Sequence, residues 1–573
     1  MMYRYVFAVI SMSAFLHMGF PRQLSAGDRD EKLVITAREI RAMNVMKISD
    51  LMNRIPGVKA GETSVSIRGS SNVKVLLDGR SINDPTSRSG AVKWSMISLD
   101  TIEKIEIFKG SGSISYGDNT SGGVIVITTK SVDRLGGTAG GYFGNNGQRN
   151  ATLSVQGRKN KLAASLSSGY ESYDGFTNND DKTRHRLGAR LDYRFTPDFS
   201  LFLSGEYNDE KKGLRGYPER RTPNSRKEYD ASSLLMGQKY GALAGRTYYS
   251  SSRTISTDPD KDLYASLKVL KAGQTLNVPV VLPLLGGVDG GTGYEWQEAS
   301  GNNFKTASEE RAWFFTAKKL EWQGSAWSFT LGMRANYYSA FRNTLNPELK
   351  VGYAKKTYNF EFAASRSNNL PTFRQRYYES SVTKPNPDLR MEKAMNYALS
   401  LSVSSDSAWS IDASVFHRDI TDRITYVRKP DNTGQYENFG KVTYQGIETS
   451  VKWTPSSLIE VSPSYIYLHA LNEETGYWLP AKPFHTVLAD VIIRPVKGLS
   501  LRASAKYTGK VYTRADNSET IPSYTVVDFR ADYQYGPVRL YIDIDNLLNE
   551  DYLYVDGYDA PPREWFIGMN YNF

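Results

Sequence analysis

Hydrophobic and polar residues alternate along most of the chain that follows residue 135. In Trp327–Tyr337 the odd positions are Trp, Phe, Leu, Met, Ala and Tyr, and the even positions are Ser, Thr, Gly, Arg and Asn. Leu499–Tyr507 and Val538–Asp545 repeat this pattern. Because successive side chains of a strand point to opposite faces, each segment is predicted to be a strand with one apolar and one polar face.

These predicted strands are long and end in aromatic residues. They run for about nine to twelve residues, a length that crosses a bilayer at a tilt, whereas globular strands average about five or six. Their apolar faces begin or end in Trp or Tyr, as at Trp327, Tyr507 and Tyr571, which is typical of the aromatic girdles of membrane barrels. A soluble β-sandwich also alternates, but both features favour a transmembrane barrel, whose strands must close on themselves.

Short connections alternate with long ones. Counting back from the C-terminus, the first short turn is Tyr535–Pro537 and the first long connection is Asn546–Glu564. On this pattern thirteen strands lie after about Arg311, five lie in Thr138–Asn208, and the weakly patterned Tyr229–Ser300 has room for four. The total, about 22, is even, as a closed up-and-down barrel requires. We expect the short turns on the periplasmic side and the long loops outside.

The N-terminal part of the chain lacks this alternation. Arg4 precedes an apolar run, Tyr5–Phe20, and small residues follow up to Gly27, which predicts a signal peptide cleaved after Ala26 or Gly27. A membrane anchor is the alternative, but the run is short. Leu33–Lys130 combines one short amphipathic helix, Ile48–Ile55, with strand-like pieces and Gly-rich joints, and therefore indicates a small α+β domain.

Composition narrows the possible chemistry. The chain has no cysteine, which excludes disulfides, thiolate metal sites and Cys nucleophiles. Its formal charge is +10, but the bases are interleaved with acids, which argues against a nucleic-acid surface. The sequence contains no phosphate-binding Gly-x-x-x-x-Gly-Lys-Ser/Thr loop and no recognisable catalytic motif, so we do not expect an enzyme.

Several motifs occur in the order and spacing of a known family. In the N-terminal domain they are Ile48–Val58, Ile67–Gly69, Val75–Gly79, Ile102–Gly110, Ser115–Gly117 and Gly122–Thr128, and further along they are Asn386–Glu392, Gly446–Glu448 and Asp545–Tyr552. Over essentially its whole mature length the chain resembles the TonB-dependent outer-membrane receptors. In layout it looks most like the smaller members, such as vitamin B12 receptors.

The resemblance implies an all-β transmembrane barrel of about 22 antiparallel strands with a small α+β plug domain in its lumen. The expected domains are a signal peptide at 1–26, a TonB box at 31–37, a plug at 38–130 and a barrel at 135–573. It also implies a location in the Gram-negative outer membrane. There the chain imports a scarce nutrient chelate with energy that TonB delivers from ExbB–ExbD.

The segment before the plug resembles the TonB box of the family. Its residues are Glu31, Lys32, Leu33, Val34, Ile35, Thr36 and Ala37. A free β-prone segment can add as a strand to the sheet edge of a partner, whereas an ordinary first strand of the plug is the alternative. If the segment binds TonB, Ile35→Pro should abolish uptake and leave ligand binding intact, because Pro removes a ladder donor.

Ligand is expected where the plug tips meet the extracellular loops. The plug candidates are Ser70, Ser71, Asn72, Arg88, Lys93 and Trp94, and the loop candidates are Arg215, Tyr217, Arg220, Arg221, Arg374 and Tyr377. The alternative to a ligand-binding role is that these plug residues lie in solvated turns. The cationic loop predicted at Glu210–Lys227 attracts an anionic ferric chelate or, alternatively, anionic lipopolysaccharide.

The cationic loop and the many tyrosines favour a ferric siderophore over cobalamin, the alternative substrate. The segment after Val58 is short, which puts a corrinoid site in doubt, and the long loop Asn368–Lys393 has no histidine, which disfavours haem. A plug argues against a passive porin. No covalently bound cofactor is expected, and the acidic clusters Asp180–Asp181 and Asp258–Asp262 are candidates for calcium. Outer-membrane lipid, lipopolysaccharide and the barrel assembly machinery complete the expected partners.

Overall fold

The computed structural model describes residues 32–43, 45–110, 112–132, 134–217, 220–282, 286–405, 408–555 and 557–573. These residues belong to one compact unit, Glu31–Phe573. The expected signal peptide, residues 1–26, and Glu31 of the expected TonB box lie outside the described residues. None of the helices in the described ranges has the length and apolar character needed to cross a membrane.

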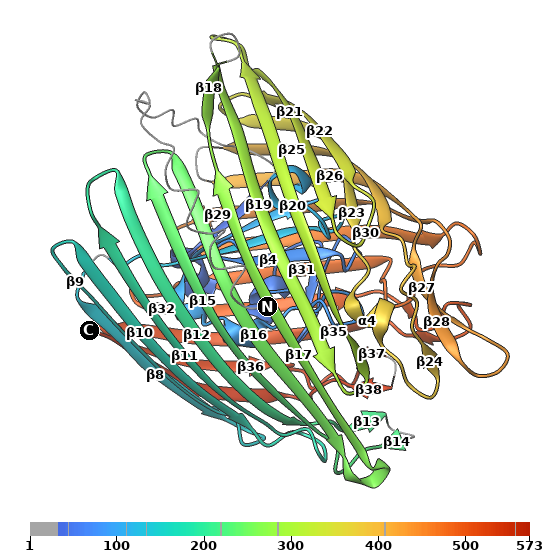
Figure 1. The fold of residues 1–573 in the computed structure, drawn as a ribbon. Coiled ribbons are helices and arrows are strands. Elements are labelled where there is room, and N and C mark those ends of the chain that lie inside the picture. The colour runs from blue at the N-terminus through green and yellow to red at the C-terminus, as the bar shows by residue number, and fades with distance from the viewer. Residues whose placement is uncertain are drawn as a thin grey trace. The chain divides into compact units, whose positions relative to one another are not determined.

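Within the described ranges, twenty-two long strands pair antiparallel into one closed barrel, which confirms the predicted architecture (Figure 1). They are β8 (Gly136–Gly144), β9 (Arg149–Lys159), β10 (Leu162–Tyr173), β11 (Lys182–Arg194), β12 (Phe199–Gly213), β15 (Arg226–Tyr240), β16 (Leu243–Asp258), β17 (Leu263–Asn277), β19 (Gly286–Gly301), β20 (Phe304–Glu321), β21 (Trp327–Tyr338), β22 (Thr344–Ala354), β23 (Tyr358–Asn369), β25 (Glu392–Ser405), β26 (Trp409–Thr421), β29 (Val442–Ser456), β30 (Ile459–Asn472), β31 (His485–Ile493), β32 (Leu499–Thr508), β35 (Tyr524–Tyr535), β36 (Val538–Asp545) and β39 (Glu564–Asn572). The last strand closes the barrel on the first, with Asn572 opposite Thr138. A short extra strand, β18 (Val280–Leu282), pairs with the start of β19.

The barrel wall is apolar outside and polar inside. In β21, Met333 is 47% exposed on the outer face, whereas the neighbouring Arg334 is only 3% exposed on the inner face. A soluble protein buries its apolar face, so this inverted burial is that of a wall with lipid outside and polar groups within.

The long connections lie at one end of the barrel and carry short elements. These are β13 (Gly216–Tyr217), β14 (Arg220–Arg221), η4 (Pro259–Lys261), α4 (Phe373–Tyr377), β24 (Thr383–Lys384), β27 (Ile424–Arg428), β28 (Gly434–Asn438), β33 (Val511–Tyr512), β34 (Thr520–Ile521), β37 (Leu553–Val555) and β38 (Tyr558–Asp559). The loop predicted at Glu210–Lys227 is shorter than expected, because β12 extends to Gly213 and β15 starts at Arg226, directly opposite. The charged residues at the ends of β12 and β15 are therefore part of the paired strands.

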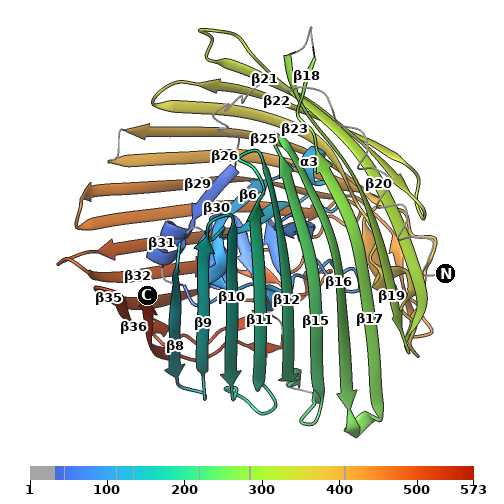
Figure 2. The ribbon, with the colours of Figure 1, turned by 60° about the vertical axis from the view of Figure 1, so that its left-hand side comes forward.

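Inside the barrel lies the N-terminal domain, blue in Figures 1 and 2. Its elements are β1 (Lys32–Thr36), α1 (Ala37–Met43), α2 (Ile48–Asn53), β2 (Val58–Ala60), β3 (Val65–Ile67), β4 (Val73–Leu77), β5 (Arg80–Ser81), η2 (Trp94–Met96), η3 (Leu99–Thr101), β6 (Ile102–Lys109), α3 (Ser113–Tyr116) and β7 (Gly123–Thr129). Five of the strands form one sheet in the order β1-β6-β7-β4-β5. Leu51, Met52, Ile105 and Ile127 are fully buried in its core, so this domain has a hydrophobic core of its own.

Candidate functional site

Two glycine motifs let the plug approach the barrel wall at Glu448. Gly57 and Gly69 both have a positive φ, and a Cβ at Gly57 would lie 2.6 Å from Glu448 Oε2. The buried Arg68 donates from Nε to Glu448 at 3.2 Å, and Lys109 also forms an ion pair with this carboxylate. The Pro-Gly-Val and Ile-Arg-Gly motifs therefore anchor the plug in the lumen.

The extracellular tips of the plug form a braced platform. The side chain of Asn83 accepts from Val75 N at 2.8 Å and donates to the carbonyl oxygens of Val73 at 2.9 Å and Gly90 at 2.8 Å. Asp84 accepts from Thr86 N at 2.8 Å. The turn that carries Arg88 is thus fixed before any ligand arrives, which lowers the entropic cost of binding.

The long loop after β23 docks on this platform. Phe373 N donates to Pro85 O at 2.8 Å, and Asn119 N donates to Asn368 O at 2.8 Å. The helix α4 starts with a capping box, in which Thr372 N donates to Gln375 Oε1 at 2.8 Å. Its Gln375 side chain then reaches back to Arg88 O at 3.0 Å. Plug and loop therefore form one continuous hydrogen-bonded unit.

Glu392, at the first position of β25, joins the plug to two extracellular loops. Its Oε2 accepts from Asn72 of the plug at 3.1 Å and from Asn369 at 2.9 Å. Its Oε1 accepts from Ile424 N at 2.9 Å and pairs with Arg423 at 3.3 Å. Glu392 therefore links Asn72 of the plug to both loops.

These contacts surround a cavity of about 330 Å³, called the apical pocket below. Ser71, Asn72, Lys74 and Arg88 of the plug line it, together with barrel residues including Lys271, Arg311, Phe341, Tyr426 and Tyr436. The volume falls within the range of about 300–1,000 Å³ typical of small-molecule sites.

As many basic as acidic side chains line the apical pocket, but two of the bases are not paired with an acid in the described part of the chain. Glu295 is paired with Arg311 and Glu309 with Arg376. Among the described residues, Lys74 and Lys271 form no ion pair with a carboxylate: Lys74 Nζ donates to Tyr116 O at 2.6 Å, and Lys271 Nζ donates to Asn83 O. Burial, and then the nearby positive charge of Arg311, lowers the pKa of Lys74 to about 7. The pocket therefore offers cationic donors to an anion.

The predicted plug residues do not all lie at the apical pocket. Ser71, Asn72 and Arg88 line the apical pocket, whereas Ser70 is buried beside it. Trp94 is buried in the plug core, where its Nε1 donates to Ser64 O at 3.3 Å, and the Lys93 ammonium lies 4.2 Å from the centre of the Tyr229 ring. Trp94 does not line the apical pocket but does line a larger crevice of about 1010 Å³, so the stacking role expected of it stays a prediction.

The predicted loop residues do not line the apical pocket. Arg374 stacks on Tyr378 at 4.0 Å, and Tyr377 packs against Phe304 and Phe373. Between them Gln375 lines the pocket instead, because adjacent residues of a helix point in different directions.

Arg215, Tyr217 and Arg220 line a second, larger crevice of about 1010 Å³ between the plug and the β8–β12 wall. The Arg215 guanidinium lies over the rings of Phe176 and Tyr558, whereas Arg221 is exposed. Lys212 donates to Glu62 of the plug at 2.8 Å. Although burial opposes ionisation, Lys212 and Lys182 hold the pKa of Glu62 below its ordinary value. The cationic loop is therefore largely committed to contacts within the protein.

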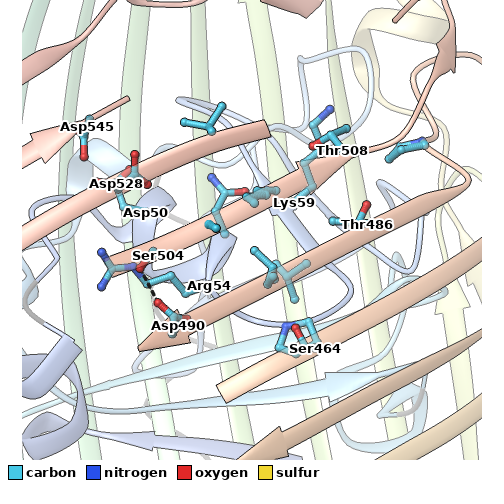
Figure 3. A pocket seen from close by; sticks show the side chains of 18 of the residues that line it. Asp50, Arg54, Lys59, Ser464, Thr486, Asp490, Ser504, Thr508, Asp528 and Asp545 are labelled. Carbon is cyan, nitrogen blue, oxygen red and sulfur yellow. Dashed lines mark hydrogen bonds between the residues drawn. The ribbon is translucent and has the colours of Figure 1, made fainter. Parts of the chain in front are cut away.

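A third cavity, of about 370 Å³, separates α2 from the β30–β36 wall. Figure 3 shows Asp50, Arg54 and Lys59 of the plug facing Asp490, Ser504 and Asp528 of the barrel. Ser504 donates a hydrogen bond to Asp490. Polar groups thus line the lumen on this side of the plug as well.

The predicted TonB-box segment forms the edge strand β1. It pairs antiparallel with β6, with Ile35 opposite Ile105, and Ile35 is 3% exposed whereas Leu33 is 41% exposed. Ala37 belongs to α1, not to the strand, because Thr36 and Glu39 cap that helix: Thr36 N donates to Glu39 Oε2 at 2.8 Å. The segment is thus a first strand of the plug sheet, with one edge unpaired in the described part of the chain.

The acidic loop clusters contact other side chains. Asp181 accepts from Arg226 at 2.6 and 2.7 Å, and Asp258 pairs with Lys261 at 2.9 Å. No group of three or more His, Cys, Asp or Glu residues in the described ranges is placed to hold a metal ion. Calcium is therefore not part of the function proposed below.

Sequence reasoning did not identify Lys74, Lys271, Arg311 or Glu392 as site residues. On the inner face of a barrel every strand presents polar residues, so alternation alone does not single out those that converge. A signal for Glu392 was present, because it ends the motif Asn386–Glu392.

Two protein-family models match the chain in succession. The TonB-dependent Receptor Plug Domain matches residues 31–124, and the model described as TonB dependent receptor-like, beta-barrel matches residues 125–547. Similar proteins include the vitamin B12 transporters BtuB of Photobacterium profundum and of Vibrio vulnificus. Each is 25% identical and covers 94% of this chain and 92% of its own.

Solved structures share the fold. The siderophore receptor PirA from Acinetobacter baumannii superposes with a TM-score of 0.80 at 16% identity, over 95% of this chain and 98% of its own. A mutant of the ferric enterobactin receptor PfeA from Pseudomonas aeruginosa, in complex with enterobactin, gives 0.79 at 17% identity, over 96% and 100%. At these sequence identities, the similarity to the solved structures shows only that the fold is shared.

Proposed function

Because the chain belongs to the TonB-dependent receptors, whose plug and barrel models together match residues 31–547, we propose that it imports a ferric siderophore bound in the apical pocket. The family consists of outer-membrane transporters and receptors, and transport by its members depends on TonB. The substrate and the residues that bind it are the new elements of the proposal.

The observation that carries the proposal is that two lysines at the apical pocket form no ion pair with a carboxylate among the described residues. Lys74 and Lys271 contact only carbonyl oxygens among the described residues, whereas Glu295 and Glu309 are each neutralised by an arginine. Ferric complexes of catecholate siderophores are anions with aromatic edges. The lysines supply charge-assisted hydrogen bonds, and Phe341 and Tyr426 supply apolar rings at the same cavity.

Coupling to TonB is assigned to β1. It is an edge strand, and an unpaired edge is a template for a strand of another chain. Its exposed residues Leu33 and Val34 are available for such pairing, whereas Ile35 is held in the plug core. TonB is thus expected to recognise Lys32–Thr36 through backbone hydrogen bonds.

Cobalamin import is the second candidate, because curated relatives named vitamin B12 transporters cover 94% of the chain. A corrinoid is larger than a catecholate siderophore and carries little net charge. The apical pocket, at about 330 Å³, favours the smaller and more anionic ligand.

The test is equilibrium binding of purified protein to a panel of ferric siderophores, haem and cobalamin, with Lys271→Met and Lys268→Met compared. Both lysines lie in β17, but Lys271 is buried on the inner face and Lys268 is exposed. Losing one charged hydrogen bond of about 1.5–3 kcal/mol should weaken siderophore binding at least about tenfold in Lys271→Met only. Tight binding of cobalamin without any siderophore binding would reject the proposal in favour of the second candidate.

A further inference from the structure

The cavity between α2 and the β30–β36 wall, called the lateral cavity below, carries bases and acids at different heights. As many basic as acidic side chains line its volume of about 370 Å³, and among the described residues it shares none with the apical pocket. Asp490, Ser504 and Asp528 lie opposite one another in the wall and form its lower row. Lys506 lies two residues beyond Ser504 towards the extracellular loops, which places it about 7 Å higher along the strand.

The upper end of the lateral cavity is basic. Lys59 of the plug, Lys482 of the connection between β30 and β31, and Lys506 of β32 all line it. Lys59 repels both of the others, so the three ammonium groups lie close together. Burial, and then the charge of Lys59, lowers the pKa of Lys482 to about 7. In the described part of the chain, neither the Lys482 nor the Lys506 ammonium forms an ion pair or a hydrogen bond, so both are available to an anionic group.

The lower end of the lateral cavity is acidic. Three aspartates that line it form no ion pair with a base in the described ranges, namely Asp50, Asp528 and Asp545. Their negative charges act on one another, so they form one group. Arg54 lines the cavity as well, but its Nη1 donates to Met43 O at 2.5 Å. This end therefore suits a cation.

Apolar side chains and the geometry of the acids narrow the chemistry of the ligand. Leu488 and Val526 flank Lys506 across the wall and line the cavity, so a ligand that reaches this lysine also contacts apolar surface. Figure 3 shows Lys59 on one side of the cavity and Asp528 on the other. No group of three or more His, Cys, Asp or Glu residues in the described ranges is placed to hold a metal ion. The cation that suits the lower end is therefore an ammonium group, which donates hydrogen bonds in three directions.

We propose that the lateral cavity binds a small zwitterion, of the size of an unblocked di- or tripeptide. Its carboxylate accepts hydrogen bonds from Lys482 and Lys506, and its ammonium group donates to Asp528 and Asp545. An extended chain covers about 3.3–3.6 Å per residue, so two or three residues span the height difference of about 7 Å between the two ends. A simple anion or a simple cation would match only one end. The site is independent of the siderophore proposed for the apical pocket.

Three peptides test the site on the full-length protein in detergent without any substitution. Tri-alanine carries both end charges, N-acetyl-tri-alanine carries only the carboxylate, and tri-alanine amide carries only the ammonium group. Each blocked peptide loses the charge-assisted hydrogen bonds of one end, so isothermal titration calorimetry should give it an affinity at least about tenfold below that of tri-alanine. Equal binding of either blocked peptide, or no saturable binding of tri-alanine at millimolar concentration, would overturn the proposal.

Two variants assign the two ends. Lys482→Met with Lys506→Met should weaken binding of tri-alanine and its acetylated form but not of the amide. Asp545→Asn should weaken binding of tri-alanine and the amide but not of the acetylated form. The controls Lys510→Met and Asp551→Asn replace exposed residues of neighbouring connections and should bind all three peptides as the wild type does. Unchanged affinity for tri-alanine in either test variant, or equal weakening of all three peptides, would reject the site.

The variant Lys271→Met separates this site from the apical pocket. In the described ranges Lys271 lines the apical pocket and not the lateral cavity, so tri-alanine should bind this variant with unchanged affinity whether or not siderophore binding is lost. Weaker binding of tri-alanine would place the peptide in the apical pocket and reject the lateral site. Heat-dependent gel mobility checks that each variant is folded, and if one is not, the comparison of the three peptides on the wild type still decides.

Discussion

Lys74 connects the acidity of the medium to ligand capture. Its pKa of about 7 results mainly from burial, and next from the charge of Arg311. The pKa is lowered, so the side chain is cationic below pH 7 and neutral above it. We predict that affinity for an anionic ferric chelate falls between pH 6 and pH 8, whereas Lys74→Met binds weakly throughout and shows no such step. Titrations at constant ionic strength, with a chelate that does not itself titrate in this range, measure the effect, and superimposable pH profiles of the two proteins would contradict it.

Glu448 is the residue on which plug docking depends most directly. It neutralises the buried Arg68 and the partly buried Lys109, so Glu448→Ala leaves two cations without their carboxylate. Removing one partner of a buried pair costs about 3–5 kcal/mol, and we predict faster hydrogen exchange in plug peptides with little change in the barrel strands. The control is Glu460→Ala, whose partners Lys452 and Arg494 are exposed and whose loss should have almost no effect. Equal exchange in both variants would contradict the anchoring role.

At the scale of elements, the sequence specified the barrel because each strand obeys one simple period. Even Tyr229–Ser300, where the pattern is weak, holds β15, β16, β17 and β19. The pattern is weak there because Gly286–Gly293 has glycine at five of its eight positions, and glycine belongs to neither the apolar nor the polar class. The sequence pattern predicted a loop where the ends of β12 and β15 pair, because charged residues in paired strands resemble those of a loop.

The site was less predictable than the fold. The motifs located the plug tips, and Ser71, Asn72 and Arg88 do line the apical pocket. Trp94 and Arg374 do not, since their direction depends on packing within η2 and α4. The barrel residues of the pocket come from strands far apart in sequence, such as Lys271 and Glu392, and their convergence follows only from closure of the barrel.

The edge strand β1 yields a prediction about coupling. Adjacent N–H groups of a strand point to opposite edges, so Leu33→Pro with Val34→Pro removes one donor on each side. Both residues are exposed, so the plug core, including Ile35, is left in place. We predict that this variant binds ligand with unchanged affinity but does not take it up, whereas Leu33→Ala with Val34→Ala transports normally. Uptake of radiolabelled ferric chelate by whole cells, with binding measured in parallel, makes the comparison. Transport by the proline variant would exclude strand pairing as the coupling contact.

In the molecule as a whole, the contacts between the plug and the barrel wall are unevenly distributed around the plug. The helix α3 packs against β20, β21, β22 and β23, and Arg334 donates to Ile114 O at 2.9 Å there. On other sides, crevices of about 370 Å³ and 1010 Å³ separate the plug from the wall along β30–β36 and β8–β12. Rearrangement of the plug should therefore start next to these crevices, where fewer packed side chains must separate.

A disulfide between α3 and β21 tests this asymmetry. The chain contains no cysteine, so a single engineered pair has no competing thiol. A Cβ at Gly332 would lie 3.1 Å from Cγ1 and 3.4 Å from Cγ2 of Ile114. Both atoms are bonded to the Cβ of Ile114, so the two Cβ positions come close to the spacing of about 3.5–4.5 Å that a disulfide requires. We predict that Ile114→Cys with Gly332→Cys transports equally well oxidised and reduced, because the tether joins surfaces that stay together while the plug opens along the crevices. Uptake that stops on oxidation and returns with reductant would instead mean that the plug leaves the wall as one body.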